Sequence, residues 1–224
     1  KVYKETSKIL LETKNKDIKV LMIANPANTN CMLLIESLKG SVAPENLTCL
    51  TRLDHNRSKF MIAKKLGVPN HHVRKIIVWG NHSSTMYPDI RFAEFKTKNG
   101  WEKVTSVIKD EAWIRDIFVP TIRTRVSAII SARGKSSSLS AASAAIDHLR
   151  NWLVGTEPED WVSMGVYTDP IYDAIPKGVV FGQPCTAING NFKVVEGLKI
   201  DDFTRKMMQT SANELIAEKK SVIS

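Results

Sequence analysis

The chain has 224 residues, of which 43% are hydrophobic and 25% are charged, and its formal net charge is +9. This composition is ordinary for a soluble globular protein that buries a sizeable core. No run of residues approaches the ~20 consecutive apolar positions that a membrane helix needs, so we exclude an integral membrane protein.

The net charge limits the kinds of partner that we expect, and the cysteines indicate the cellular compartment. A high positive charge can serve an acidic partner such as nucleic acid, tubulin or a membrane surface. The basic residues are scattered, however, without a long block of like charges and without a nucleic-acid motif. We therefore expect a solvated surface with no nucleic-acid or membrane partner. The cysteines show no paired spacing, which predicts a reducing, cytoplasmic setting with neither a disulfide framework nor a metal site.

The first predicted elements lead to a polar strand end. Residues 1–16 have the amphipathic pattern of a helix, and residues 18–24 form an apolar run that is typical of a buried parallel strand. Pro26 ends this strand. Asn25 therefore lies at the carboxyl end of a parallel strand, where open α/β sheets bind ligands. The competing interpretation of Asn25 is a turn residue before proline.

The next elements place an aspartate and an arginine on one helix. We expect a helix over residues 29–39, a short strand over 47–50 and a longer helix over 52–66. Asp54 and Arg57 are three residues apart and so share one helix face. From this spacing alone, a surface salt bridge worth about 0.2–0.5 kcal/mol explains the pair at least as well as a functional site does.

A histidine follows the next predicted strand, which covers residues 73–79. A carboxylate that accepts from Nδ1 of a histidine fixes its tautomer and leaves Nε2 free to take a proton. An arginine can bind a carboxylate through two parallel hydrogen bonds. Asp54, Arg57 and His82 would together suit proton removal from a hydroxyl of a carboxylate-bearing substrate. The competing interpretation of His82 is a loop histidine that bonds only to backbone.

The remainder of the chain predicts helices and then an antiparallel meander. The helices are expected over residues 102–109, 111–133 with a kink or break at Pro120, 136–153 and 201–222, and the strands or extended segments over 87–96, 161–167, 179–187 and 192–195. The last three strands follow one another through short Pro/Gly turns, which is the pattern of antiparallel neighbours.

Three motifs, read in chain order, carry a family resemblance. They are Asn25-Pro26-Ala27-Asn28-Thr29-Asn30, Leu53-Asp54-His55-Asn56-Arg57 and Gly80-Asn81-His82-Ser83-Ser84. Together they resemble malate dehydrogenase of the cytosolic type, and the resemblance covers nearly the whole chain. It implies an α/β fold in which the rear part of a Rossmann-type parallel sheet is followed by an α+β substrate domain with an antiparallel meander. Residues 1–46 would be the remnant of the dinucleotide-binding domain, and residues 47–224 would be the substrate domain.

The resemblance implies a role for each candidate residue. Arg57 would bind the C1 carboxylate of malate, and His82 would take the proton of the C2 hydroxyl while a hydride is transferred, giving oxaloacetate. Asp54 would hold His82 and stabilise its charge. Asn25 and Ser137 would contact the substrate, with Ser137 as the small hydroxyl that also faces the nicotinamide.

The implied cofactor is NAD, contacted by Ile23, Ala24, Asn25 and His82. The family begins with a glycine-rich turn against the pyrophosphate and carries a mobile loop whose arginines bind the substrate. Neither a GxGxxG motif nor such a loop occurs in this sequence. We therefore expect the chain to be the rear part of such an enzyme, and the complete protein to be a homodimer with the Asp54–Arg57 helix near its partner.

Departures from the family pattern leave alternatives open. Arg125-Val126 replaces a usual Arg-Gly, and residues 169–173 replace a loop that normally contains glycines. These changes suggest a divergent paralogue, and they allow a catalytically silent member that acts as a structural component of a cytoskeletal or axonemal assembly. The intact Asp54, Arg57 and His82 favour an enzyme. A lactate-type enzyme is a third alternative, because the specificity arginine belongs to the absent loop.

Overall fold

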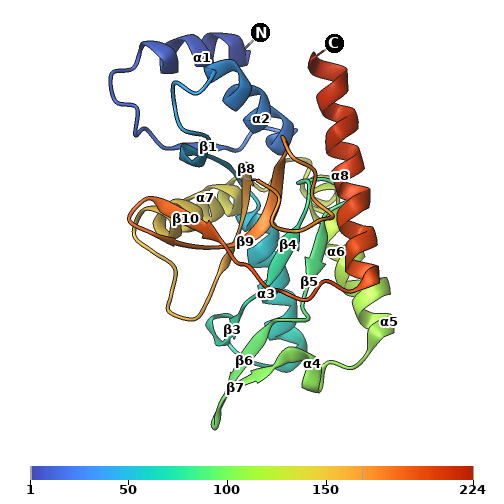
Figure 1. Ribbon diagram of the computed structural model, residues 1–224. Coiled ribbons are helices and arrows are strands. Elements are labelled where there is room, and N and C mark those ends of the chain that lie inside the picture. The colour runs from blue at the N-terminus through green and yellow to red at the C-terminus, as the bar shows by residue number, and fades with distance from the viewer. Residues whose placement is uncertain (1, 168, 224) are drawn as a thin grey trace.

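The main sheet is mixed, with a parallel pair followed by an antiparallel meander. The computed structural model describes residues 2–167 and 169–223, and the strands of this sheet lie in the order β1-β2-β8-β9-β10 (Figure 1). Strands β1 (Val20–Met22) and β2 (Leu47–Cys49) pair in parallel. Strands β8 (Val162–Tyr167), β9 (Val180–Ile188) and β10 (Asn191–Val194) continue the sheet in antiparallel fashion. The predicted fold class is confirmed.

The parallel pair is connected by helix α2 (Ala27–Leu38), which is buried along most of its length. Helix α1 (Val2–Glu12) packs on α2 and ends four residues earlier than the predicted helix, whose first residue, Lys1, lies outside the described residues. The short 3-10 turn η1 (Pro44–Asn46) leads into β2. Because Pro26 stands at the N-cap of α2, the chain turns from strand to helix immediately after Asn25.

Helix α3 (Arg52–Leu66) has the bounds that the sequence predicted. It ends at Gly67, whose φ of 68° is left-handed and whose N–H donates to the carbonyls of Ala63 and Lys64. The helix packs against α7 (Ser138–Leu153) and strand β8. Its buried side includes Leu53 and Asp54, so the helix places a carboxylate toward the protein interior.

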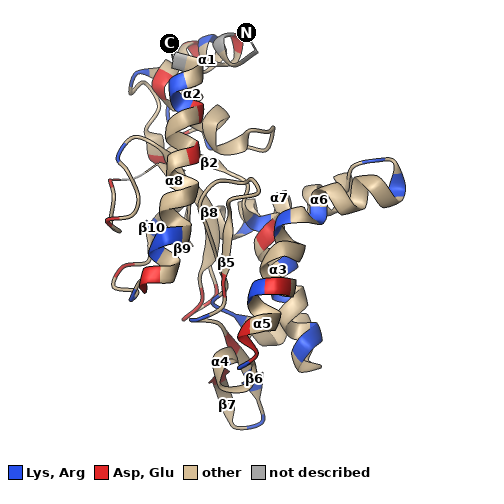
Figure 2. Cartoon of the chain, turned by 90° about the vertical axis from the view of Figure 1, so that its right-hand side faces the viewer, with Lys and Arg blue, Asp and Glu red and all other residues tan. Residues whose placement is uncertain are grey.

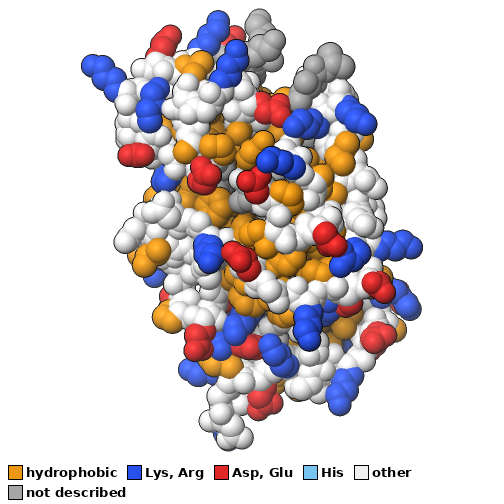
Figure 3. All heavy atoms as spheres, viewed as in Figure 1, with side chains coloured by type: hydrophobic (Ala, Val, Ile, Leu, Met, Phe, Trp, Pro, Cys, Tyr) orange, Lys and Arg blue, Asp and Glu red, His pale blue; other side chains and the backbone are white. Residues whose placement is uncertain are grey.

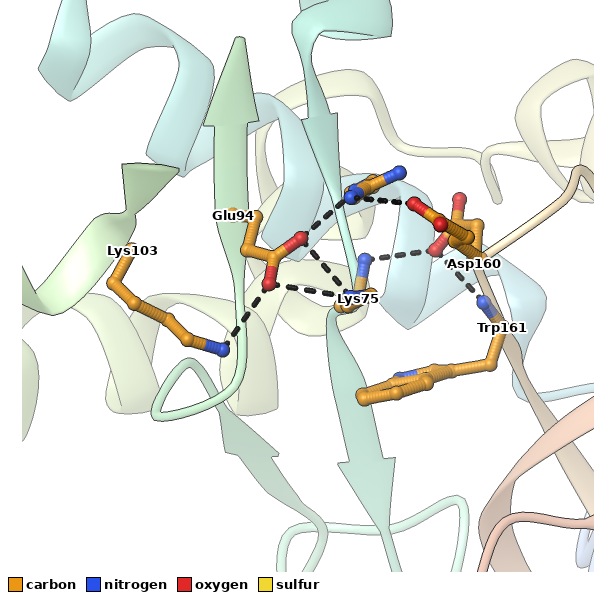
Figure 4. A network of polar contacts seen from close by, with 7 residues as sticks. Lys75, Glu94, Lys103, Asp160 and Trp161 are labelled. Atoms are coloured by element: carbon orange, nitrogen blue, oxygen red, sulfur yellow. Dashed lines mark hydrogen bonds and ion pairs between the residues drawn. The ribbon is translucent and has the colours of Figure 1, made fainter. Parts of the chain in front are cut away.

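The predicted strand over residues 73–79 is wrong, because the structure divides it into β3 (Val73–Arg74) and β4 (Ile77–Trp79) in different sheets. The break is at Lys75, which has a φ of 60°. Its N–H donates to Asp160 Oδ1 at 2.8 Å, and its Nζ lies 3.1 Å from a carboxylate oxygen of Glu94 (Figure 4). These contacts hold Lys75 in a left-handed conformation that ends the ladder.

The segment over residues 87–96 divides in the same way. Strand β5 (Tyr87–Asp89) pairs with β4, whereas β6 (Glu94–Thr97) pairs with β3 and with β7 (Gly100–Lys103). The predicted helix over 102–109 is wrong at its start, because those residues belong to the β6–β7 hairpin and only α4 (Val104–Val107) is helical. Gly100 makes this hairpin possible with a φ of 120°.

Pro120 is accommodated without a break in the predicted helix over 111–133. The helical run consists of α5 (Glu111–Trp113), the π-helical turn η3 (Ile114–Phe118) and α6 (Val119–Arg133). Proline has no N–H to donate to the carbonyl one turn earlier, and a widened turn directly before it removes that requirement. Helix α6 extends away from the body of the molecule (Figure 2).

Helix α8 (Asp202–Ile223) lies along one edge of the molecule, beside β5 and α2 (Figure 1). Asp201 caps it by accepting from Thr204 N at 2.7 Å. The core between these elements contains fully buried Trp79 and Phe181, among other large side chains. The 3-10 turn η2 (Asn70–His72) lies outside it.

The surface mixes charges of both signs. On the face shown in Figure 3, lysine and arginine side chains alternate with aspartate and glutamate around a central apolar area. Over residues 2–167 and 169–223, no helix is both long and apolar enough to cross a membrane.

Candidate functional site

The loop after β4 carries His82 and is fixed at its first residue. Gly80 and Gly182 of β9 exchange two backbone hydrogen bonds, of 3.1 and 2.8 Å. Gly80 has a φ of 98°, and a Cβ there would lie 2.7 Å from the Cβ of Ser211. Only glycine fits this position. The start of the loop therefore packs closely between β9 and α8.

The structure brings His82 against Asp54. His82 Nδ1 and Asp54 Oδ2 are 2.5 Å apart, and the aspartate side chain is 1% exposed. Burial lowers the pKa of His82, but the adjacent charge of Asp54 outweighs burial, so that the net shift is upward. Nε2 lies at the opposite edge of the ring and has no hydrogen-bond partner within the part of the chain that the structure describes. The geometry therefore leaves Nε2 as the ring nitrogen open to proton exchange.

Arg57 lies beside this pair. Its Nη1 is 3.4 Å from Asp54 Oδ1, and its Nη2 is 3.3 Å from Ser137 Oγ. Burial lowers the pKa of Arg57, with Asp54 opposing the shift and Arg125 adding to it, yet a guanidinium remains charged at neutral pH. Both contacts are long, so the guanidinium can also donate to an added carboxylate.

Arg57 also borders a groove of about 470 Å³ between α3, α6 and α7. Two further cations, Lys64 and Arg125, line it together with apolar side chains such as Phe60 and Ile122. Of the predicted residues, Arg57 lines this groove, and direct contacts join it to Asp54 and Ser137 and, through Asp54, to His82.

Three of the four predicted cofactor residues, Ile23, Ala24 and Asn25, form an exposed segment after β1. Ile23 is 48% exposed, and Ala24 and Asn25 are exposed beside it. The carbonyl of Ala24 accepts from Asn30 Nδ2 at 3.0 Å, which ties the segment to α2. No hydrogen bond joins the side chain of Asn25 to His82, Arg57 or Ser137 in the described chain, so the structure leaves its predicted role untested. The carboxyl end of a parallel strand is where open α/β sheets bind ligands.

Asn28 is a site residue that the sequence analysis missed. It is fully buried, and its Oδ1 accepts from the backbone N–H of His82 at 2.9 Å. Its Nδ2 donates to the carbonyl of Val180 at 2.9 Å and to that of Gly80 at 3.3 Å. The amide thus fixes the loop from the side of α2. Its place inside the Asn-Pro-Ala-Asn-Thr-Asn motif was the signal that could have identified it.

Helix α8 supplies a second set of residues that were missed. Ser211 Oγ accepts from Asn81 N at 2.7 Å, and the Glu214 and Glu218 carboxylates accept from the Asn81 amide at 2.8 and 3.1 Å. Buried positions recur along α8 at Thr204, Met208, Ser211 and Leu215, and Glu218 continues this spacing. A carboxylate on the buried stripe of a helix is unusual and was a readable signal.

The other buried histidines have structural roles. His55 Nδ1 contacts Ser163 Oγ at 3.1 Å, and His148 Nε2 contacts Thr48 Oγ1 at 3.0 Å. Burial, with Arg52 adding to it, lowers the pKa of His148 to about 3, and burial also lowers the pKa of His55. Burial therefore disfavours the charged form of both rings, whereas the net pKa shift of His82 is upward. In the described residues, no group of three His, Cys, Asp or Glu side chains could hold a metal ion.

Comparison with known sequences identifies dehydrogenase relatives. A family profile described as lactate/malate dehydrogenase, alpha/beta C-terminal domain, matches residues 51–224. The cytoplasmic malate dehydrogenase of Medicago sativa is 45% identical over 218 residues, which covers 97% of this chain and 65% of that protein. Probable malate dehydrogenase 3 of Dictyostelium discoideum is 43% identical, with 99% of this chain and 66% of that protein covered. The chain thus spans about 65% of the length of its curated relatives.

Solved structures give a similar result. Lactate dehydrogenase of Trichomonas vaginalis, in complex with NADH and oxamate, has a TM-score of 0.94 and 37% identity and covers 99% of this chain and 67% of its own. Malate dehydrogenase of Naegleria fowleri has a TM-score of 0.91 and 39% identity, with 99% and 66% covered. Both dehydrogenase types therefore share this fold over nearly the whole chain.

Proposed function

The chain belongs to the lactate/malate dehydrogenase family, and from this we propose that the complete protein interconverts malate and oxaloacetate with NAD(H) as cofactor. The 2.5 Å contact between Asp54 and His82 carries the proposal. A buried carboxylate on Nδ1 of a histidine with a raised pKa is the arrangement that general acid–base transfer at Nε2 requires. Malate is favoured because the curated relatives that match are named malate dehydrogenases.

The proposed mechanism uses three side chains of this chain. The Arg57 guanidinium binds the C1 carboxylate and orients C2 toward His82. Neutral His82 Nε2 accepts the hydroxyl proton of malate, and in the reverse direction the imidazolium donates this proton to the carbonyl oxygen of oxaloacetate. Asp54 stabilises the imidazolium in both directions. The cofactor, when bound, accepts or supplies the hydride.

The two domains of the proposal meet within one sheet. We assign residues 1–46 to the dinucleotide-binding part and residues 47–224 to the substrate part, and we propose that Ile23, Ala24 and Asn25 contact the nicotinamide end. The parallel β1–β2 pair crosses this boundary, and the Gly80–Gly182 bridge attaches the loop that carries His82 to the same sheet. Following the names of the relatives, we also propose a cytoplasmic location, and we retain a homodimer as the expected assembly.

The test is an assay of oxaloacetate-dependent NADH oxidation on the complete protein. His82→Asn should lower kcat about 10²–10⁴-fold, the usual contribution of general acid–base catalysis, while NADH still binds, as measured by fluorescence. The matched control is His71→Asn, because His71 is an exposed histidine outside the site. Turnover that survives in His82→Asn would exclude the mechanism.

One observation favours a second substrate. The Trichomonas vaginalis structure with the TM-score of 0.94 is a lactate dehydrogenase, so pyruvate is assayed alongside oxaloacetate. If kcat/KM is higher for pyruvate than for oxaloacetate, the proposed substrate changes to lactate and pyruvate, and the proposed roles of His82 and Arg57 stay the same. None of the relatives described above supports the alternative of a cytoskeletal or axonemal component.

A further inference from the structure

A single carboxylate oxygen on α8 collects three donors from the histidine loop. Glu214 Oε2 accepts from Ser83 Oγ at 2.5 Å, from Thr85 Oγ1 at 2.6 Å and from Asn81 Nδ2 at 2.8 Å. Asn81 and Ser83 come immediately before and after His82 in the chain, and Thr85 lies three residues after it. The loop that presents the imidazole is therefore held on both sides of His82 by one acceptor on a different element.

A second carboxylate extends the attachment to α2. Glu218 Oε1 accepts from Asn81 Nδ2 at 3.1 Å, and its Oε2 accepts from the hydroxyl of Thr29. Thr29 follows Asn28, whose Oδ1 holds the backbone N–H of His82. The two carboxylates and the Asn28 amide thus join α2, the loop and α8 in one hydrogen-bonded network.

Partly buried carboxylates are costly unless donors satisfy them. Charge-assisted hydrogen bonds are roughly twice as strong as neutral ones and are more directional. A hydrophobic residue at position 214 would have packed α8 onto the loop without defining the orientation of the Ser83 and Thr85 side chains. The carboxylate at this position therefore orders the loop in a way that apolar packing would not.

We propose that Glu214, supported by Glu218, is a positioning residue that holds the Gly80–Thr85 loop so that His82 meets Asp54 and the substrate. This inference rests on the proposed dehydrogenase function. In the proposed mechanism Glu214 contacts neither the substrate hydroxyl nor His82 Nε2, and it acts only through the loop. A misplacement of about 1 Å at a catalytic group can cost about 10²-fold in rate, which sets the scale of the expected effect.

The proposal is distinct from a general stabilising role of α8. The helix is also attached to α2 by the Lys219–Glu36 ion pair of 2.6 Å, and this pair makes no contact with the loop. The charged groups that face the loop or its histidine are Asp54 and Arg57 from α3, Arg123 from α6, and Glu214 and Glu218 from α8. A change at Glu214 therefore reaches His82, whereas a change at Glu36 reaches only the attachment of the helix.

The experiment compares the complete wild-type protein with Glu214→Gln, with the double variant Ser83→Ala/Thr85→Val, and with the control Glu36→Gln. We expect the first two to lower kcat about 10–100-fold with little change in the KM for oxaloacetate, and to move the titration midpoint of His82 to lower pH. The midpoint is measured by NMR of the histidine ring carbons and needs no turnover. The double variant keeps the Glu214 carboxylate, so it separates lost hydrogen bonds from lost charge.

Each outcome bears on one of the two proposals. Equal kcat and an unchanged His82 midpoint in Glu214→Gln would overturn the positioning role, as would an equal loss in Glu36→Gln. A midpoint shift in Glu214→Gln alone, without one in the double variant, would reduce the role of Glu214 to its charge and overturn the proposal. If the wild-type protein turns over neither oxaloacetate nor pyruvate, the dehydrogenase function fails, and the His82 titration still decides whether Glu214 positions the loop.

Discussion

One proton at His82 connects the chemistry to pH. The imidazolium form is stabilised by Asp54, so it persists above the ordinary histidine pKa of about 6.5. Oxaloacetate reduction needs this protonated form and malate oxidation needs the neutral form. The two directions of the proposed reaction therefore have opposite pH dependence.

The first prediction follows from this opposite pH dependence of the two reaction directions. The rate of oxaloacetate reduction should be highest below the pKa of His82 and should decline as pH rises through it, whereas malate oxidation should increase over the same range. Asp54→Asn removes the stabilising charge, so both midpoints should move to lower pH and kcat should fall about 10²–10⁴-fold. The check is kcat against pH in both directions. Midpoints that stay in place after Asp54→Asn would contradict the role of the carboxylate.

At the scale of helices and strands, the Gly80–Gly182 bridge is the feature that fixes the start of the histidine loop. It joins the two-stranded β4–β5 sheet to β9 of the main sheet. A Cβ on Gly182 would lie 2.8 Å from the carbonyl oxygen of Gly80 and 2.9 Å from that of Val78. Two backbone strands therefore approach each other at a distance that only glycine permits.

Gly182→Ala should destabilise the protein by about 1–3 kcal/mol, the usual cost of inserting a methyl group into a packed interior. Because the clash pushes on the start of the histidine loop, kcat should fall as well. Denaturant unfolding and the oxaloacetate assay measure the two effects. Gly197→Ala is the control, since a Cβ at Gly197 would meet nothing within 4 Å. Its backbone strain should cost stability without lowering kcat, and equal kcat losses in both variants would refute the link to the loop.

Sequence patterns were reliable where local signals agreed. The helix over residues 52–66 has an apolar pattern and ends at Gly67, and the structure gives it those bounds. The strand over 73–79 failed because Lys75 is held in a left-handed conformation by Asp160, which lies 85 residues away along the chain. A contact of that separation has no signature in the local sequence.

The candidate site shows the same contrast between local sequence signals and long-range contacts. The family resemblance singled out Asp54, Arg57, His82 and Ser137, and the structure brings these four side chains together. Glu214 was not found, because its partners in the loop lie 129 to 133 residues earlier. The predicted roles of Asn25, Ile23 and Ala24 remain predictions.

At the scale of the whole molecule, the three cysteines are enclosed in the core. Cys31, Cys49 and Cys185 are all buried and free. Burial raises the pKa of Cys31 to about 12 and raises those of the other two thiols, Cys49 also through Cys31. Thiolates are therefore scarce in the folded state at neutral pH.

The last prediction concerns this enclosure. The native complete protein should leave these three thiols unmodified by a water-soluble maleimide at neutral pH, and unfolding in guanidinium should expose all three. Peptide mass spectrometry after each treatment measures the labelled sites. Rapid labelling of Cys31 or Cys49 in the native protein would mean that the α2–sheet interface opens locally, contrary to the packed core described here.

The attachment of the histidine loop to α8 has a consequence for biosynthesis. Ser83 precedes Glu214 by 131 positions, and ribosomes add about 5–20 residues per second. Roughly 7–26 s therefore pass between synthesis of the loop and synthesis of the carboxylate that fixes it. A nascent chain that already contains Asp54, Arg57 and His82 still lacks the α8 hydrogen bonds to the loop. Translation that stops before Ser211 should therefore leave a polypeptide with every proposed catalytic residue and a lowered kcat.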